Sequence, residues 1–335
     1  MATIKDIARE TGLGLATISK YLNGGTVREK NRLAIEAAVD KLGYTVNELA
    51  RSLKTSRSRT IGVVIPELGN AFVTTIITEM EDILRKNGYS VIVCDCRTDA
   101  AQEREAVRFL LQKRVDGILN MPVSRDGTHL DSALEAGVPV VLIDRMIDRL
   151  AGKVHSILVD NAAGASAAVS RLIDAGHRHI GVILGPQGVF TTAQRHLGYS
   201  RAMTRNGLTP DAAFVVYGDY TVQGGYEGMR RLLELPGLTA VFVTNYEMTL
   251  GAIIAGNELS VKIPERLSLI GFDNLQLSQV IQPRLTIVTQ PLKEIGEAAA
   301  GIFLEALEAD APEIRELVLN TGLLEGDSVG TISEP

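Results

Sequence analysis

Cysteine is scarce in this chain of 335 residues, where only Cys94 and Cys96 are present. They flank Asp95 within an apolar run, so in an extended strand both side chains would point to the same face. A structural metal site would need further ligands at suitable spacing, and the five histidines are scattered. We therefore expect two reduced thiols in a hydrophobic core, no metal site and no cofactor.

The sequence also lacks long apolar segments. No run reaches the roughly 18 apolar residues that a membrane-spanning helix needs. The first ten residues, MATIKDIARE, carry charges and do not contain the apolar stretch of a secretory signal peptide. These absences predict a cytoplasmic protein with no membrane partner.

Motifs of well-known catalytic sites are missing as well. The chain has no Gly-x-Ser-x-Gly nucleophile turn, no Walker phosphate loop and no His-Glu-x-x-His pair. Sparse acidic residues at the ends of strands serve binding as well as catalysis. We therefore expect a binding protein with no catalytic residues, and an enzyme is the less favoured class.

Charge is unevenly distributed along the chain. Residues 1–58 contain 10 Lys and Arg against 6 Asp and Glu, whereas the rest contains 24 against 34. A basic end on an acidic body is typical of a protein in which only that end contacts nucleic acid. The length predicts two or three domains.

Three short helices are predicted in the basic segment. A capping box at Thr3–Asp6 opens the first helix, and its apolar face continues to Thr11. The helical period restarts over residues 15–22. A second capping box, Thr26–Glu29, opens a third helix that ends at Gly43.

A Gly-x-Gly turn, Gly12-Leu13-Gly14, joins the first two of these helices. Dinucleotide-binding loops share this pattern, but they require a preceding strand and a third glycine, where this chain has a helix and Thr17. Two short helices joined by such a turn form a helix-turn-helix, whose second helix enters the major groove of DNA. A small helical subdomain without a DNA role is the alternative.

From Ile61 onward, short β-branched runs alternate with helix-length amphipathic segments. The runs include IGVVIP, SVIVCDC, DGILNMP, VPVVLID, HIGVILG, AAFVVYGD, AVFVTN and LSLIGFD. Apolar strands that alternate with helices predict parallel sheets covered on both faces. Because IGVVIPELGNAF and IGVILGPQGVF repeat one order of strand, turn and Phe, and the region exceeds one ordinary core, we expect two similar lobes.

Polar and aromatic side chains follow several of these strands. Ligands of such sheets bind beyond the carboxyl ends of the strands, so these side chains converge if the two lobes face each other. Carboxylates, amides and arginine forks bind vicinal hydroxyl groups, and aromatic rings supply apolar walls. The set predicts a site for a sugar or sugar acid, formed by Asn70, Phe72, Asp144, Arg145, Asp160, Arg195, Tyr220, Asn245 and Asp273. Taken singly, Asp273 also fits a plain turn and Asp144 a helix cap.

The segment TIKDIARETGLGLATISKYLNG closely resembles the headpiece of the lactose/galactose-repressor (LacI/GalR) family of bacterial transcription regulators. The resemblance continues through KLGYTVNELARSLKTSRSRTIGVVIP. It implies an all-α helix-turn-helix headpiece over residues 1–46, a hinge helix and linker over 47–60, and an effector-binding and dimerisation domain over 61–335. That domain is expected to have a two-lobed α/β periplasmic-binding-protein-like (type I) fold, with an N-lobe of about 61–161 and 291–321 and a C-lobe of about 162–290 and 322–335.

The resemblance also implies which residues contact DNA. Leu15, Ala16 and Lys20 match base-reading positions, where Lys20 can donate to guanine edges and the other two make only apolar contacts. The other implied contacts are Thr3, Thr17, Ser19, Asn23, Tyr44, Asn47, Ala50, Arg51 and Leu53. Leu53 would act as an apolar wedge in the minor groove, or else pack on the following domain. Gly14 departs from the family, which usually has a capping Ser there, although Gly is a tolerated N-cap.

These features predict a repressor that binds a pseudo-palindromic operator in double-stranded DNA as a homodimer, under allosteric control by a sugar or sugar acid between the lobes. No C-terminal heptad repeat follows, which favours a dimer over a tetramer. Arg195, Asn245 and Asp273 match the family's effector-binding positions, but Tyr246 replaces the usual Asp and Val73 replaces an aromatic wall. A purine or phosphoprotein co-repressor is one alternative, and a sugar-binding receptor or enzyme of similar fold is another.

Overall fold

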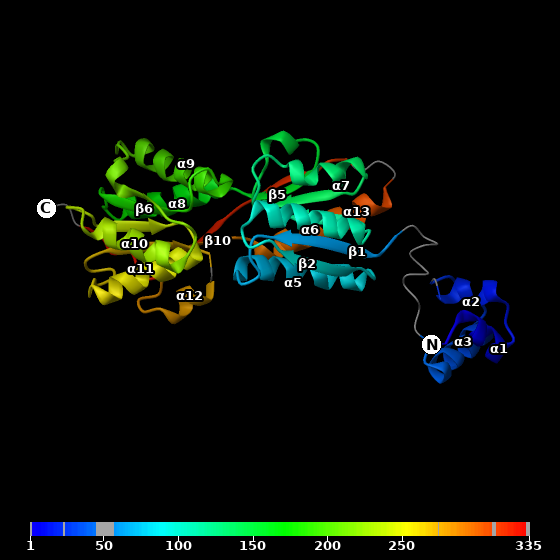
Figure 1. Cartoon of the computed structure of the whole chain (residues 1–335). Helices are drawn as coiled ribbons and strands as arrows, with labels where there is room; N and C mark the ends of the chain where they lie inside the picture. Colours follow the sequence, from blue (N-terminus) through cyan, green and yellow to red (C-terminus); the bar gives the residue numbers. More distant parts are fainter. Residues whose placement is uncertain (1, 23, 45–56, 274, 310–312, 333–335) are drawn as a thin grey trace. The chain divides into compact units, whose positions relative to one another are not determined.

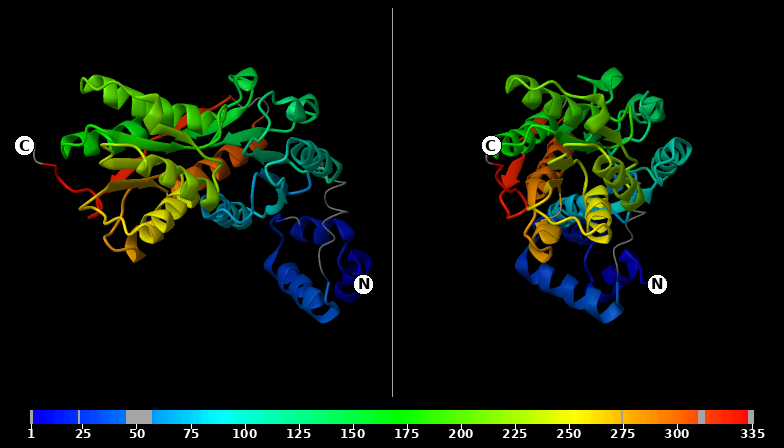
Figure 2. Two further views of the ribbon diagram at one scale, coloured as in Figure 1. Left: turned by 60° about the vertical axis from the view of Figure 1, so that its left-hand side comes forward. Right: turned by 90° about the vertical axis from the view of Figure 1, so that its left-hand side faces the viewer.

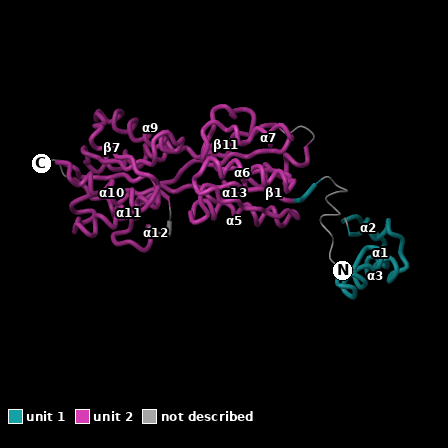
Figure 3. Tube along the Cα trace, viewed as in Figure 1, with its two compact units in different colours: residues 1–59 teal, residues 60–335 magenta. Residues whose placement is uncertain are grey.

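The computed structural model describes residues 2–22, 24–44, 57–273, 275–309 and 313–332. The chain divides into two compact units, residues 1–59 and 60–335, which are coloured separately in Figure 3. The predicted hinge helix, which contains Asn47 and Leu53, lies outside the described residues. Within the described part of the chain, no helix is long and apolar enough to cross a membrane.

The N-terminal unit is called the headpiece below, and its described residues form three helices. These are α1, Ile4–Thr11, α2, Leu15–Leu22, and α3, Glu29–Leu42. Each helix contributes one fully buried isoleucine to a shared core: Ile7, Ile18 and Ile35. The first predicted capping box is confirmed, because the Asp6 carboxylate accepts hydrogen bonds from the backbone N–H and the hydroxyl of Thr3.

The second predicted capping box is wrong. α3 begins only at Glu29, and its N-cap residue is Arg28, which is extended and makes no side-chain cap bond. The preceding turn accounts for the later start, because the backbone N–H of Gly25 donates to the Lys20 carbonyl at 2.8 Å and ties the chain back to α2. Gly43 ends α3 in the left-handed conformation, with φ of 57°, as predicted.

The second unit, called the body, contains two six-stranded sheets (Figure 1). The N-lobe sheet consists of β1, Thr60–Ile65, β2, Ser90–Asp95, β3, Gly117–Asn120, β4, Val140–Ile143, β5, His155–Val159, and β11, Glu316–Leu319, in the order β11-β5-β4-β3-β1-β2. The C-lobe sheet consists of β6, Ile180–Leu184, β7, Val215–Tyr217, β8, Ala240–Val243, β9, Ser268–Phe272, β10, Thr286–Thr289, and β12, Gly322–Leu324, in the order β12-β10-β9-β8-β6-β7.

The pairing of these strands is parallel, as the apolar runs predict, with one exception. The edge strand β12 runs antiparallel to β10. The eight runs singled out from the sequence correspond to β1–β4 and β6–β9. The four strands outside that set include β11 and β12, whose residues alternate between exposed and half-buried and so lack a continuous apolar run.

Helices cover both faces of each sheet (Figures 1 and 2). On the N-lobe these are α5, Ala71–Lys86, and α13, Leu292–Glu308, on one face, with α6, Ala100–Gln112, and α7, Asp131–Glu135, on the other. On the C-lobe they are α8, Asn161–Asp174, and α9, Phe190–Arg205, opposite α10, Val222–Leu233, and α11, Tyr246–Glu258. The short α12, Leu275–Val280, follows β9.

Alternation along β1 shows how one strand serves two cores. Val63 and Ile65 are buried against α5 and α13, whereas Val64 is buried against α6 and α7. Successive side chains of a strand point to opposite faces, so a strand covered on both sides is apolar throughout. β1 and β6 hold the same place in the strand order of their sheets, in agreement with the sequence repeat that predicts two similar lobes.

The chain passes between the two sheets three times: from β5 into α8, from β10 into α13, and from β11 into β12. The two lobes are therefore joined by three connections. Figure 1 shows these segments between the lobes. The C-terminal ends of the central strands face the space between the lobes, and the polar residues discussed next follow those ends.

Both cysteines are free and lie where the strand pattern predicts. Cys96 is buried, and Cys94 is half-buried against the same core as α6 and α7. Burial raises the pKa of the Cys96 thiol to about 11. A thiol protonated at neutral pH is a poor nucleophile and a poor metal ligand, which fits a packing role.

Candidate functional site

The headpiece exposes the three residues that the sequence assigns to base reading. Leu15, Ala16 and Lys20 of α2 are all exposed, whereas Ile18 of the same helix is buried in the headpiece core. A Cβ on Gly25 would lie 2.7 Å from Cγ of Lys20, so the lysine stem rests directly on this glycine. The turn after α2 therefore positions the Lys20 side chain at the surface.

The other predicted DNA contacts occupy mixed environments. Thr17 and Ser19 are half-buried on α2, and Thr3 is the N-cap of α1. Tyr44 is half-buried and packs against the headpiece core. Five predicted contacts lie outside the described residues: Asn23, Asn47, Ala50, Arg51 and Leu53.

A cavity of about 330 Å³ lies between the lobes of the body, at the carboxyl ends of the strands. Eight of the nine predicted effector-binding residues line it: Asn70, Phe72, Asp144, Arg145, Arg195, Tyr220, Asn245 and Asp273. The first four belong to the N-lobe and the last four to the C-lobe. The cavity, called the effector cavity below, is therefore built from both lobes.

Asp160 is the predicted residue that does not line the effector cavity. It follows β5 and is the N-cap of α8, where its Oδ1 accepts a hydrogen bond from the backbone N–H of Ala163 at 2.8 Å. A carboxylate so placed stabilises the positive end of the helix. Asp160 thus has a structural role as a helix cap, and an effector contact by it stays a prediction.

Helix caps also hold two residues that do line the cavity. Asn70 is the N-cap of α5 and Asn245 the N-cap of α11, and each accepts a backbone hydrogen bond through its side-chain oxygen. Their amide nitrogens converge on one carboxylate, because Asn70 Nδ2 donates to Glu247 Oε1 at 3.1 Å and Asn245 Nδ2 donates to Glu247 Oε2 at 2.6 Å. Since Asn70 belongs to the N-lobe, Glu247 connects the two lobes.

Four lining residues have strained backbone conformations, and one of them is Thr98, with φ of 55°. Asp144, Tyr220 and Asp273 have φ values of 69°, 66° and 65°, in the left-handed region that side chains rarely adopt. Such strain is concentrated at functional sites, where the surrounding structure holds a side chain in a required direction. Here it directs two carboxylates and a phenol into the space between the lobes.

Arg195 and Asp273 form the electrostatic centre of the cavity. Arg195 is 4% exposed, its Nε donates to Asn161 Oδ1 at 2.8 Å, and its guanidinium lies 3.8 Å from the centre of the Phe272 ring. Burial raises the pKa of Asp273 to about 6, although the charge of Arg195 and a hydrogen bond from Gln290 act in the opposite direction. The site thus holds a fixed donor fork beside a carboxylate that is costly to keep ionised.

Sequence reasoning missed further residues of the cavity. Gln290 follows β10, a short strand that the apolar runs do not include, and Thr191 lies one helical turn before Arg195 on α9. The Tyr220 hydroxyl is within hydrogen-bond distance of Thr191, at 3.0 Å, and of Thr192, at 2.7 Å. The helical spacing from Arg195 is the one sequence signal that pointed to Thr191.

Comparison with known proteins agrees with this geometry. Residues 3–47 match the family model described as "Bacterial regulatory proteins, lacI family", and residues 169–329 match that of a "Periplasmic binding protein-like domain". Catabolite control protein A of Priestia megaterium is 34% identical to this chain, over 92% of this chain and 93% of that protein. The chain belongs to the LacI family.

Other relatives of this LacI-family protein have the same organisation. The HTH-type transcriptional repressor CytR of Escherichia coli (strain K12) is 33% identical over 92% of this chain and 90% of that protein. The structure of the lac repressor dimer bound to operator and the anti-inducer ONPF matches with a TM-score of 0.86 at 25% identity, covering 98% of this chain and 99% of that one. The transcriptional regulator CelR–cellobiose complex matches with a TM-score of 0.75 at 29% identity, covering 98% and 100%.

The LacI-family protein is therefore a DNA-binding transcriptional regulator of the repressor type, and not an enzyme. The helical headpiece and the two-lobed α/β body that the sequence predicts are both confirmed.

Proposed function

We propose that this LacI-family repressor binds a pseudo-palindromic operator as a homodimer and is controlled by a sugar or sugar acid in the effector cavity. The observation that carries the effector class is the convergence of hydrogen-bonding side chains from both lobes on one cavity of about 330 Å³. Carboxylates, an amide and an arginine fork beside Phe72 and Tyr220 suit a ligand with many hydroxyl groups and apolar ring faces.

The homodimer is supported by symmetry and by a relative. One headpiece reads only a half-site, and a two-fold dimer matches two inverted half-sites. The lac repressor matched above is a dimer bound to operator.

The coupling follows from the two-lobed architecture. We assume two relative arrangements of the lobes, one with high and one with low operator affinity. A ligand that contacts both lobes can shift operator affinity only as far as it binds one of these arrangements more tightly than the other. Glu247 already joins the lobes through Asn70, so the effector would act on an interface that exists without it. The sign we propose is release of the operator by the effector.

The experiment first selects operator sequences from a random DNA library, and then screens sugars, sugar acids and purines by thermal shift. Ligands that bind the native state raise its unfolding temperature. We expect a sugar or sugar acid to stabilise the body and to weaken operator binding. In Asp273→Asn the ligand should lose both effects, while operator binding without ligand is retained. A purine as the stabilising ligand would contradict the proposed effector class.

DNA contact by Lys20 has its own test. We expect Lys20→Ala to cost about 1–3 kcal/mol of binding free energy on the preferred operator and to relax the preference at one base pair of each half-site. Lys5→Ala, a change at an exposed lysine of α1, is the matched control and should leave the base preference unchanged. Equal loss across all sequences in Lys20→Ala would instead assign this side chain to a phosphate.

A further inference from the structure

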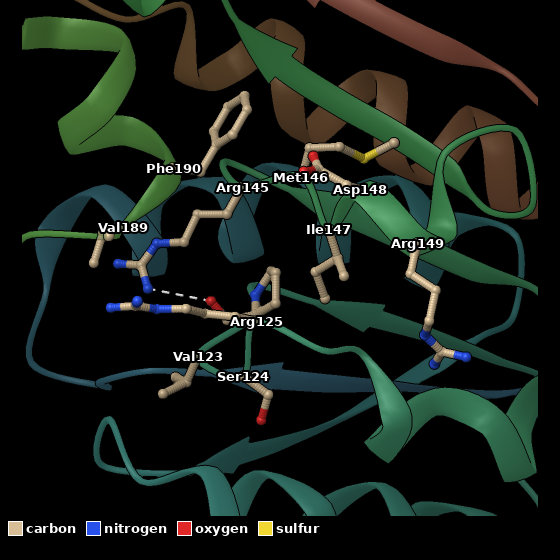
Figure 4. A pocket seen from close by; sticks show the side chains of 12 residues that line it. Val123, Ser124, Arg125, Arg145, Met146, Ile147, Asp148, Arg149, Val189 and Phe190 are labelled. Atoms are coloured by element: carbon tan, nitrogen blue, oxygen red, sulfur yellow. Dashed lines mark hydrogen bonds between the residues drawn. The ribbon is translucent and has the colours of Figure 1, made fainter.

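A second cavity, of about 450 Å³, lies beside the effector cavity. Arg145 and Val189 line both cavities. The N-lobe contributes the loops after β3 and β4, and the C-lobe contributes the segment Gly188–Phe190 at the start of α9. Figure 4 shows this arrangement, in which Arg145 is the one residue with a role assigned above.

The two cavities differ in charge. The effector cavity is lined by four acidic residues, Glu67, Asp144, Asp219 and Asp273, and by two arginines. The second cavity is lined by three arginines, Arg125, Arg145 and Arg149, and by a single acidic residue, Asp148. The two neighbouring cavities therefore differ, one having a more acidic lining and the other a basic one.

Two of the three arginines are directed to the same side of the second cavity. In Figure 4 the guanidinium groups of Arg125 and Arg145 point to one side, while Arg149 points to the other. Arg149 is already engaged, because its Nη2 donates to Asp131 Oδ1 at 2.6 Å and its Nε donates to the Asp126 carbonyl. We therefore leave Arg149 out of the ligand-binding set.

Arg125 is bonded to an uncharged group, whereas Arg145 contacts both a carbonyl and the carboxylate of Asp144, with which it forms an ion pair. Arg125 Nη2 donates to the carbonyl of Gln187 across the lobe boundary at 2.9 Å, and among the described residues it forms no ion pair with a carboxylate. Arg145 Nη1 donates to the carbonyl of Pro122 at 3.1 Å, and its Nε lies 3.4 Å from Asp144 Oδ2 without a hydrogen-bond partner among the described residues. Each guanidinium has five N–H donors, so both retain donors for an anion.

The C-lobe side of the cavity is shaped for this arginine pair. Gly188 has φ of 77°, and a Cβ there would lie 2.2 Å from Nη1 of Arg125, so only glycine lets the guanidinium rest on this backbone. The next residues open α9, a helix of 16 residues whose N-cap, Val189, supplies no side-chain cap. The uncapped first N–H groups and the positive end of the helix add to the field of the arginines.

We infer that the second cavity binds the anionic group, a carboxylate or a phosphate, of an effector whose hydroxyl-bearing part occupies the effector cavity. The inference rests on the proposed effector function and extends it to the charge of the ligand. Arg125, Arg145 and the start of α9 would bind the anion with charge-assisted hydrogen bonds from both lobes. An anion so bound would hold the lobes together at a place where Arg125 already joins them.

The test uses the full chain at pH 7.5, with inorganic phosphate and acetate as separate probes of the two anion classes and chloride at equal ionic strength as the reference. We expect one of the two anions to raise the unfolding temperature of the body in the wild-type protein. Arg125→Gln should weaken the apparent affinity for that anion by roughly tenfold. Gly188→Ala should have the same effect because the new methyl group displaces the guanidinium.

Arg149→Gln is the matched control, since it removes an arginine of the same cavity that points away, and it should keep the wild-type response. No stabilisation by either anion, or equal losses in Arg125→Gln and Arg149→Gln, would overturn the inference.

Neutral sugars serve as a second probe, which distinguishes failure of the anion site from failure of the proposed effector function. If they stabilise the wild type but not Asp273→Asn while the anions fail, the effector function stands without an anion site. If an anion acts through Arg125 but no sugar or sugar acid stabilises the body, the effector class fails and the anion site stands.

Discussion

Asp273 combines a functional position with an energetic cost. Its backbone is strained, at φ of 65°, and its carboxylate is buried beside Arg195 in the effector cavity. A raised carboxyl pKa means that the folded state prefers the protonated form, so the charged form costs stability at neutral pH. A cost of this kind is retained where the group serves binding.

This cost gives a prediction for pH. Because the folded pKa of Asp273, about 6, lies above its ordinary value of 3.8, the favourable contribution of this group is full below pH 3.8 and is lost as the pH rises through about 6. Asn has a neutral side chain and tolerates the left-handed backbone. We expect Asp273→Asn to raise the free energy of unfolding at pH 7.5 by about 1–2 kcal/mol, after discounting for solvent screening.

Chemical denaturation of wild type and variant at pH 7.5, 6.5 and 5.0 measures this effect. The advantage of Asp273→Asn should shrink as the pH falls. An advantage that is constant across the three pH values would show that lost strain or altered packing, and not the charge, is responsible.

At the scale of elements, strands with a long apolar run could be predicted and strands with a short one could not: the half-exposed β2 was recognised, whereas the buried β5 and β10 were missed. The runs at β1 and β6 are apolar throughout because helices cover both faces, whereas β11 and β12 alternate and resemble loops. Gln290 was missed because it follows β10, a buried strand of only four residues that begins and ends with Thr. β5 was also missed, since it begins with the polar residues His155 and Ser156, and Asp160 was therefore assigned to the cavity without a recognised strand before it.

Helix caps limited the prediction of the site in a second way. Asn70, Asn245 and Asp160 all follow strands and all cap the next helix. Only the first two also line the cavity. The local sequence of a strand end therefore indicates a cap, and does not by itself tell whether the cap contacts a ligand.

The turn between α1 and α2 offers a matched pair of substitutions. Gly14 accepts hydrogen bonds at its carbonyl from the N–H groups of Thr17 and Ile18, as an N-cap does, and a Cβ there would meet no atom within 4 Å. Gly12 has φ of 68°, in the left-handed region. We expect Gly14→Ser to stabilise the headpiece by a few tenths of a kcal/mol, and Gly12→Ser to destabilise it by about 1 kcal/mol.

Hydrogen exchange of the α1–α3 amides in the full chain measures both changes. It reports the opening free energy of the headpiece separately from that of the body. If Gly14→Ser and Gly12→Ser changed protection in the same direction, the cap geometry at α2 would be wrong.

At the scale of the whole molecule, the two units differ in their response to acid. All five histidines belong to the body. Burial lowers the pKa of His129, His155, His177 and His196 below the ordinary 6.5. His177 illustrates the packing, because its ring nitrogens contact the Thr239 hydroxyl and the Gly330 carbonyl, both at 3.0 Å, and so connect the C-terminal segment to the C-lobe.

The sign of this response follows from the lowered pKa values. The four histidines contribute their full stabilisation above pH 6.5, where they are neutral. This stabilisation is lost as the pH falls through their pKa values in the folded state. In the headpiece, hydrogen bonds are the chief cause that lowers the pKa values of Asp6 and Glu36 from 3.8 and 4.5. The headpiece therefore begins to lose the stability that these carboxylates contribute only in more acidic solution. We expect acid between pH 6.5 and 5 to destabilise the body but not the headpiece.

Amide hydrogen exchange of both units across this range tests the expectation. Asp273→Asn is the suitable background, because it removes the opposing titration of that carboxyl. Loss of protection in the headpiece before the body would contradict the assignment.

The three passages of the chain between the lobes have a consequence for how such a regulator can be recombined. The headpiece is one contiguous segment, so a single junction in the gene exchanges its DNA-reading surface for another. Each lobe is assembled from separate stretches of sequence, and a single junction inside the body therefore combines unrelated halves of one sheet. One junction between the two units thus pairs any headpiece with any body, whereas a new effector for an existing body must arise by substitution within the two lobes.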